Sequence, residues 1–195
     1  PIRITTLAPG HFLTLGRDGA KEVRPYWQPR FRAGEKLSAD DWVDQMRTML
    51  LESTARHMQA DVPVGAFLSG GIDSSTVCAL YQKYSSIPVR TFSIGFEESG
   101  YNEADDARRV AEHLGTVHHE RTVTVHEARD VIPLLPAMYD EPFADSSQIP
   151  THLVSRFARE QVTVALTGDG GDELFAGYNR HFAAPRLWAQ MQNVE

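Results

Sequence analysis

The segment Phe67–Ser75 ends an apolar run in a glycine-rich turn, and its residue types suit a binding site for pyrophosphate. Gly70 and Gly71 let backbone N–H groups approach an anion without an intervening Cβ atom. Hydroxyl groups are supplied by Ser69, Ser74 and Ser75. Because a helix is expected to begin after the turn, its free N–H groups and the positive end of its dipole also favour an anion. The sequence therefore predicts a phosphate-binding turn.

Asp73 places a carboxylate inside this turn, where other phosphate-binding loops have a different residue. The pattern lacks the lysine of G-x-x-x-x-G-K-[ST] and does not match G-x-G-x-x-G. Since a bare carboxylate repels phosphate, a bridging Mg²⁺ would make its presence favourable. The alternative is a simple strand-to-helix turn in which Asp73 and Ser74 cap the helix. A cap alone needs neither two glycines nor three hydroxyl groups.

A second glycine-rich turn, Gly168–Glu173, follows the apolar run Val162–Leu166. In open parallel sheets, ligands bind beyond the carboxyl ends of the strands. If the strands before the two turns are neighbours, Asp73 and Asp172 face one crevice and can share a Mg²⁺ ion. The alternative for this segment taken alone is a flexible acidic loop.

Apolar runs and helical patterns alternate along most of the chain. Strands are expected near 63–68, 89–94, 117–123 and 162–166, and helices near 73–84, 104–114 and 148–159. A helical region interrupted by prolines is expected between the third strand and the last of these helices. This alternation predicts an α/β fold with a doubly wound parallel sheet.

The amino-terminal segment differs from the rest of the chain. Short strand-like runs are predicted at Ile2–Thr5, His11–Leu15 and Val23–Trp27. Further along, Ser38 and Asp41 predict a capping box that opens a helix. Apolar residues at helical spacing follow it, and we expect their face to be core: Trp42, Val43, Met46, Met49 and Leu50.

Ser69–Ser75 matches the SGGxDSS signature of the N-type ATP pyrophosphatases, and the longer pattern resembles the synthetase domain of glutamine-dependent asparagine synthetases. The resemblance continues through Phe92–Phe96, His118–Glu120, Asp140–Pro142 and Leu166–Tyr178. It implies an adenine nucleotide alpha hydrolase-like sheet. It also implies that residues 1–30 are the carboxyl-terminal remnant of an Ntn-type glutaminase domain, 31–37 a linker and 38–195 the amino-terminal part of a truncated synthetase domain. Both ends of the chain are expected to be cut from a longer protein.

The resemblance also implies roles for individual residues. Backbone groups of Leu68 and Ile94 would contact the adenine side of ATP, and Thr167 and Gly168 would form the second nucleotide-contacting turn. Asp169 stands where the family commonly has a glutamate, and it would position substrate or take a proton. Phosphate ligands would be Ser69, Gly70, Gly71, Ser74 and Ser75, with Asp73 and Asp172 on Mg²⁺.

The implied reaction uses ATP and Mg²⁺ to adenylate the side-chain carboxylate of aspartate, after which ammonia from glutamine displaces AMP. A sister activity would keep the adenylation but change the acyl substrate, as in β-lactam synthetase-like or peptide-cyclising enzymes. A tRNA-modifying enzyme is disfavoured by the acidic charge and the absence of paired cysteines. From another class, a non-catalytic nucleotide-binding module would have less need of both carboxylates. A serine hydrolase would need a G-x-S-x-G elbow.

Composition limits the partners and the compartment. A net charge of −7 argues against a nucleic-acid-binding protein. No apolar run has the length of a membrane span, so no membrane partner is expected. The single cysteine, Cys78, is expected to pack in a buried helix position, and a cytoplasmic protein is expected. The family resemblance implies a homodimer.

Two groups of polar residues remain open to interpretation. His113, His118 and His119 fit no transition-metal ligand spacing and are expected to be strand and surface histidines. Asp140, Glu141 and Asp145 either line the substrate cleft or simply end the segment before them.

Overall fold

The computed structural model describes residues 5–30, 36–97, 103–141 and 144–192. The chain divides into two compact units, residues 1–43 and 44–195, and the boundary falls within helix α1 (Ala39–His57). The domain boundaries expected from the sequence therefore stay a prediction. Each unit is described by itself.

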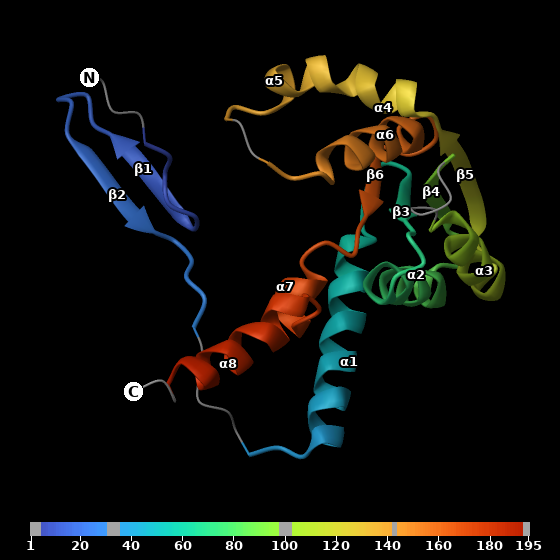
Figure 1. Ribbon diagram of the computed structural model, residues 1–195, viewed down its shortest axis with the longest axis horizontal. Helices are drawn as coiled ribbons and strands as arrows, with labels where there is room; N and C mark the ends of the chain where they lie inside the picture. Colours follow the sequence, from blue (N-terminus) through green and yellow to red (C-terminus); the bar gives the residue numbers. More distant parts are fainter. Residues whose placement is uncertain (1–4, 31–35, 98–102, 142–143, 193–195) are drawn as a thin grey trace. The chain divides into compact units, whose positions relative to one another are not determined.

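The first unit contains a hairpin of β1 (His11–Leu15) and β2 (Lys21–Pro25), which pair antiparallel (Figure 1). Two of the predicted strands are thus confirmed, whereas the strand expected at Ile2–Thr5 lies almost wholly outside the described residues. Side chains such as those of Leu13 and Val23 remain about half exposed. A two-stranded hairpin of this kind buries too little apolar surface to be stable alone.

Helix α1 begins with the capping box that the sequence predicts. The Asp41 backbone N–H donates to Ser38 Oγ at 3.1 Å, and the Ser38 backbone N–H donates to Asp41 Oδ2 at 3.2 Å. The Ser38 hydroxyl also donates to Asp41 Oδ2, at 2.6 Å, and this bond, together with the bond from the Ser38 backbone N–H, holds the pKa of the Asp41 carboxyl below its ordinary value. The helix therefore starts where its first turn can satisfy its own free N–H groups.

The expectation that the apolar face of α1 is core is wrong. Most side chains on that face are 39–69% exposed, namely those of Trp42, Val43, Met46 and Met49, whereas Leu50 is half-buried. Helical spacing determines which side chains share a face, but it does not determine whether another element covers them. Among the described residues of α1, only Thr54 is buried.

The second unit is built on a parallel sheet of four strands in the order β5-β4-β3-β6. The strands are β3 (Val64–Phe67), β4 (Arg90–Phe96), β5 (Val117–Val123) and β6 (Val164–Leu166). Gly65 pairs with Ala165 and Phe92 with His119. After β5 the chain therefore returns past β4 and β3 to form the opposite edge, with β6 beside β3 (Figure 1).

Helices cover both faces of this sheet, which confirms the doubly wound α/β fold. On one face, α2 (Ile72–Tyr84) packs over β3, and α3 (Ala104–Leu114) packs over β4 and β5. On the other, α4 (Val125–Val131) and α6 (Gln148–Ala158) pack over β4 and β5. The proline-interrupted region forms a short 3₁₀ turn, Ile132–Leu134, followed by α5 (Leu135–Met138). The remaining helices are α7 (Gly171–Phe175) and α8 (Asn179–Met191).

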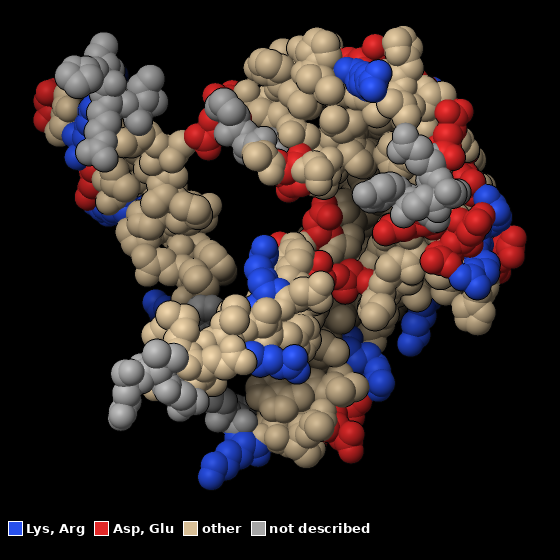
Figure 2. All heavy atoms as spheres, in the orientation of Figure 1, with Lys and Arg blue, Asp and Glu red and all other residues tan. Residues whose placement is uncertain are grey.

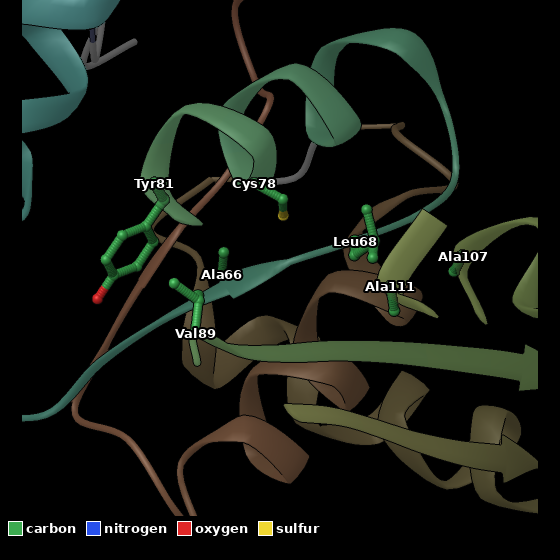
Figure 3. Close-up of a cluster of buried hydrophobic side chains, with 7 residues drawn as sticks. All are labelled: Ala66, Leu68, Cys78, Tyr81, Val89, Ala107 and Ala111. Carbon is green, nitrogen blue, oxygen red and sulfur yellow. The ribbon is translucent and has the colours of Figure 1, made fainter. Parts of the chain in front are cut away.

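Small side chains let α2 and α3 lie close to the sheet. Figure 3 shows Cys78 pointing from α2 toward Ala66, with Ala107 and Ala111 nearby on α3. Cys78 is fully buried, and burial raises the pKa of its thiol to about 12. The prediction that Cys78 is a packing residue is confirmed. No helix among the described residues is long and apolar enough to cross a membrane.

Phe92 should be the costliest core side chain to remove. It is fully buried, packs edge-to-face on Phe157 and stacks on His119 with ring centroids 5.2 Å apart. We expect Phe92→Ala to lower the free energy of unfolding by about 3–5 kcal/mol. The 69%-exposed Ile87 is the control, and Ile87→Ala should change it by less than about 0.5 kcal/mol. Equal urea midpoints for the two variants would contradict this assignment of the core.

Candidate functional site

The strand order brings the two glycine-rich turns to the same place. Because β3 and β6 are parallel neighbours, the turns that follow them leave the same edge of the sheet. The crossover to α2 then covers one face, while α6 lies on the other. The gap between β3 and β6 is therefore the switch point of the sheet, which is where ligands bind in folds of this kind.

A cleft of about 1180 Å³ opens at this edge. Most of the predicted site residues line it: Leu68, Ser69, Gly71, Asp73, Ser74, Ile94, Thr167, Gly168, Asp169 and Asp172. Figure 2 shows acidic atoms gathered in the hollow beside α7. The structure thus unites residues that lie 100 positions apart in the sequence.

The two turns touch one another directly. A Cβ atom built on Gly168 would lie 2.7 Å from the Ser74 backbone nitrogen and 3.0 Å from the Asp73 carbonyl carbon. A Cβ atom on Gly171 would collide with the Asp73 carboxylate. The condition on which the sequence argument depended, that the two strands are neighbours, is therefore met.

Serine hydroxyls organise the first turn. The hydroxyls of Ser69 and Ser74 lie 2.9 Å apart, and Ser74 Oγ accepts from the Ser69 backbone N–H at 3.2 Å. Ser74 Oγ also donates to the Gly71 carbonyl at 3.3 Å. The N-cap residue of α2 is Gly71, which has no side-chain cap. The alternative that Asp73 and Ser74 act as helix caps is therefore wrong. At the cap itself, the Gly71 backbone N–H donates to Ser69 Oγ at 3.3 Å.

Gly70 and Ser75 belong to the turn but do not line the cleft. Gly70 has φ +82°, and a Cβ atom there would lie 2.7 Å from the Cβ atom of Asp106 at the start of α3. This glycine therefore lets the turn pack against α3 in a left-handed conformation. Ser75 Oγ is buried and has no hydrogen-bond partner among the described residues.

Carboxylates dominate the polar lining, and among the described residues no lysine or arginine lines the cleft. The six acidic residues of the lining are Asp73, Glu103, Asp145, Asp169, Asp172 and Glu173. An anionic ligand would enter this cleft only with cations to offset its charge. The chemistry of the donor set therefore fits a hard divalent cation such as Mg²⁺.

Asp73 and Asp172 fit the magnesium role as a pair. Both line the cleft, and Asp73 lies against Gly171, the residue before Asp172. No group of three or more metal-ligating side chains occurs among the described residues. Since Mg²⁺ is usually held by one or two carboxylates together with substrate phosphates and waters, two carboxylates are enough.

Sequence reasoning missed some residues of the cleft wall. Glu103 and Tyr178 both line it, and the Tyr178 hydroxyl donates to Glu173 Oε1 at 2.7 Å. This bond raises the pKa of the Tyr178 hydroxyl and lowers the pKa of the Glu173 carboxyl. Tyr178 lies in a motif that the sequence singled out, whereas Glu103 has no local signal.

The residues left open by the sequence are now placed. Asp145 lines the cleft. The Ser147 backbone N–H donates to the Asp145 carboxylate at 2.8 Å, and this bond lowers the pKa of the Asp145 carboxyl. Asp140 and Glu141 are not part of the lining. His118 lies between β5 and α3, and His119 stacks on Phe92 on the opposite face.

The contact between the turns predicts that Gly168 tolerates no side chain. Gly168→Ala would push on backbone atoms of Asp73 and Ser74, so we expect it to destabilise the protein by about 1–3 kcal/mol. Gly71→Ala is the matched control, because a Cβ atom there meets only Ser69 Oγ, at 3.3 Å. Equal urea midpoints for these two variants would contradict the direct contact.

Known proteins share sequence similarity with the part of the chain that forms the site. The asparagine synthase family matches residues 45–195. Asparagine synthetase (glutamine-hydrolyzing) 1 of Bacillus subtilis is 36% identical over 176 residues, covering 90% of this chain and 28% of that protein. A putative asparagine synthetase (glutamine-hydrolyzing) 2 of Methanocaldococcus jannaschii is 41% identical over 146 residues, covering 74% and 28%. This chain thus spans about 28% of the length of both relatives.

Among solved structures, the NMN synthetase from Francisella tularensis superposes with a TM-score of 0.46 at 16% identity, covering 73% of this chain and 59% of that one. A likeness of this degree supports no inference about function. The match over residues 45–195 includes both glycine-rich turns and the whole parallel sheet. The chain belongs to the asparagine synthase family.

Proposed function

We propose that this chain forms the ATP-binding part of an AMP-forming amide ligase. The observation that supports this most strongly is the direct contact between the two glycine-rich turns in one cleft. One turn offers hydroxyl and backbone N–H groups at the start of α2, and the other offers carboxylates. Such a pairing suits a nucleotide that is cleaved between its α- and β-phosphates.

The first turn would hold the pyrophosphate portion of ATP. Ser69, Ser74, the backbone of Gly71 and the N–H groups at the start of α2 would provide donors. Gly70 and Ser75, which do not line the cleft, stay ligands predicted from the sequence alone. Backbone groups of Leu68 and Ile94 would contact the adenine side, and Thr167 and Gly168 would contact the nucleotide from the second turn. Apolar side chains also line the cleft, among them those of Phe96 and Val154, and they would suit a base.

Asp73 and Asp172 would hold Mg²⁺, whose charge offsets that of the phosphates and of the acidic cleft. Their carboxylates otherwise add to the negative charge of the lining, which disfavours the free nucleotide. The two residues would therefore make nucleotide binding depend on a divalent cation. Within the described residues, no cationic side chain of the lining could take over this task.

The chemistry would be adenylation followed by amide formation. A carboxylate oxygen of the substrate attacks the α-phosphorus, the bond from the α-phosphorus to the α,β-bridging oxygen breaks, and pyrophosphate leaves. Ammonia then attacks the acyl carbon, AMP departs with the former carboxylate oxygen, and the amide remains after loss of a proton. Residues of the cleft mainly position the reactants and stabilise charge that develops on the leaving pyrophosphate.

The finer assignments extend this proposal to the whole protein. The acyl substrate would be aspartate, the ammonia would come from glutamine in a glutaminase domain, and the product would be asparagine. Asp169 would position the substrate or accept a proton. The protein would be cytoplasmic and would form a homodimer.

Asp169 itself favours a second candidate within the same chemistry. It is one methylene shorter than the glutamate common in this position of the family, and it lines the cleft. A shorter carboxylate leaves more room beside the reacting centre. The protein would then be a sister ligase whose acyl substrate is a carboxylic acid larger than aspartate.

Removing either magnesium carboxylate should weaken cation-dependent binding. We expect Asp73→Asn and Asp172→Asn each to lower the affinity for Mg²⁺-pyrophosphate by roughly 30-fold or more, since a charged contact worth about 2 kcal/mol is lost. Isothermal titration calorimetry measures this affinity. Asp130→Asn removes one exposed charge from α4, outside the cleft, and should leave it unchanged. Wild-type affinity in either site variant would exclude a shared magnesium site.

The products distinguish the proposed function from its alternatives. The purified protein with ATP, Mg²⁺, aspartate and ammonia should yield AMP and asparagine in equal amounts, measured by chromatography. AMP that appears only with another carboxylate would support the sister ligase. Formation of ADP, or nucleotide binding without cleavage under all of these substrates, would contradict AMP-forming ligation.

A further inference from the structure

A network of hydrogen-bonded hydroxyl groups and one histidine lies beneath α3 and ends at a residue that lines the cleft. Thr91 Oγ1 lies 2.9 Å from His118 Nδ1, and Ser93 Oγ lies 3.1 Å from His118 Nε2. Thr91 is fully buried, and Ser93 is 5% exposed. Ser93 lines the cleft, one residue before Ile94. Both ring nitrogens of His118 are thus engaged, one of them by a residue of the cleft.

Thr116, at the other end of this network, determines the direction of the hydrogen bonds in it. Thr116 Oγ1 donates to the Ala111 carbonyl at 3.4 Å, and a carbonyl can only accept. Thr116 Oγ1 must then accept from Thr91 Oγ1, which lies 3.0 Å away. With its proton used, Thr91 Oγ1 accepts from His118 Nδ1–H. This network therefore assigns the tautomer of His118 that carries its proton on Nδ1.

The tautomer of His118 fixes the direction of the hydrogen bond that it makes with Ser93. With the proton on Nδ1, the neutral ring has a free lone pair on Nε2, so Ser93 Oγ must donate to it. The proton of Ser93 points at His118, and the lone pairs of Ser93 Oγ remain for a ligand. Because Ser93 is one of the residues that line the cleft, its Oγ would accept, and not donate, a hydrogen bond from a ligand there.

We infer that Ser93, held in this orientation by His118, selects a nucleobase that presents an exocyclic amino group. This inference rests on the proposed nucleotide function and adds a specificity-determining residue, Ser93, and a positioning residue, His118. An amino-bearing purine such as adenine donates to the lone pairs of Ser93. A 6-oxo purine presents an acceptor there and leaves two acceptors facing each other.

The orientation of Ser93 should reverse when His118 is protonated. Imidazolium carries protons on both nitrogens, so Nε2–H would donate to Ser93 Oγ and release the Ser93 proton toward the cleft. Burial lowers the pKa of His118 below its ordinary value, which keeps the ring neutral at neutral pH. Glu120 opposes this shift, and His119 and Arg108 add to it.

A separate pocket gives His118 its own route to solvent. It has a volume of about 280 Å³ and is lined on the α3 side by Arg108 and Glu112, and on β5 by His118 and Glu120. Charged atoms of both signs cover this part of the surface (Figure 2). A proton can therefore reach His118 without passing through the nucleotide cleft.

The test compares binding of Mg²⁺-ATP and Mg²⁺-ITP to the purified protein by calorimetry. We expect the wild-type protein to prefer ATP at neutral pH, and Ser93→Ala to lower that preference roughly threefold to tenfold. As the pH falls below about 6.5, the ordinary pKa of histidine, the wild-type preference should fall because His118 gains its proton. His118→Gln and Ser93→Ala should both lose this pH dependence, which a purely structural role of His118 would not produce.

His119→Gln is the matched control. His119 is the next residue of β5 but stacks on Phe92 on the opposite face, so the variant should keep both the preference and its pH dependence. Binding of both nucleotides with a ratio that Ser93→Ala and pH leave unchanged would overturn this inference alone. Binding of neither nucleotide would overturn the proposed function together with it.

Discussion

The close contact between the turn after β3 and the turn after β6 is the constraint on which the site depends. Gly168 lies against the backbone of Asp73 and Ser74, and Gly171 lies against the Asp73 carboxylate. Parallel pairing of β3 with β6 brings the turns together, and the absence of Cβ atoms lets them touch. A side chain at either glycine would separate the hydroxyls of one turn from the carboxylates of the other.

The charge of the cleft constrains its ligand as strongly as its shape does. Acidic side chains of both turns face the same space, and among the described residues no basic side chain offsets them. A nucleotide is itself strongly negative, so its binding requires a cation, and its phosphates need the donors at the start of α2. In the proposed function, the acidic lining would hold Mg²⁺ and the start of α2 would hold phosphate, as two parts of one site.

Much of the fold and the site could be predicted because local patterns encode them. Ser38 and Asp41 cap a helix through contacts three residues apart, and Gly115 ends α3 in a left-handed conformation, φ +70°. Local patterns cannot encode whether another element packs on a helix face, or which residues far apart in the sequence lie together. The apolar face of α1 has helical spacing, yet side chains such as Met49 remain exposed. Glu103 reaches the cleft because of how α3 packs, which no local pattern announces.

Successive side chains of a strand point to opposite faces of the sheet, and the two histidines of β5 illustrate this. His118 and His119 are adjacent in β5 and therefore lie on opposite faces, one in a polar network and the other on an aromatic ring. Strand alternation separates their side chains, but the partners of each come from another strand: Thr91 and Ser93 for His118, and Phe92 for His119. Only the packed structure shows that Ser93 connects one of these histidines to the cleft.

Hydrogen–deuterium exchange with Mg²⁺-pyrophosphate as the ligand would test the central claim most directly, because it reports on both turns at once without assuming an acyl substrate. The shared site predicts that residues 68–75 and 167–173 gain protection together, and that both lose it when Mg²⁺ is removed. Protection of only one of the two segments would contradict a single phosphate site built from both turns.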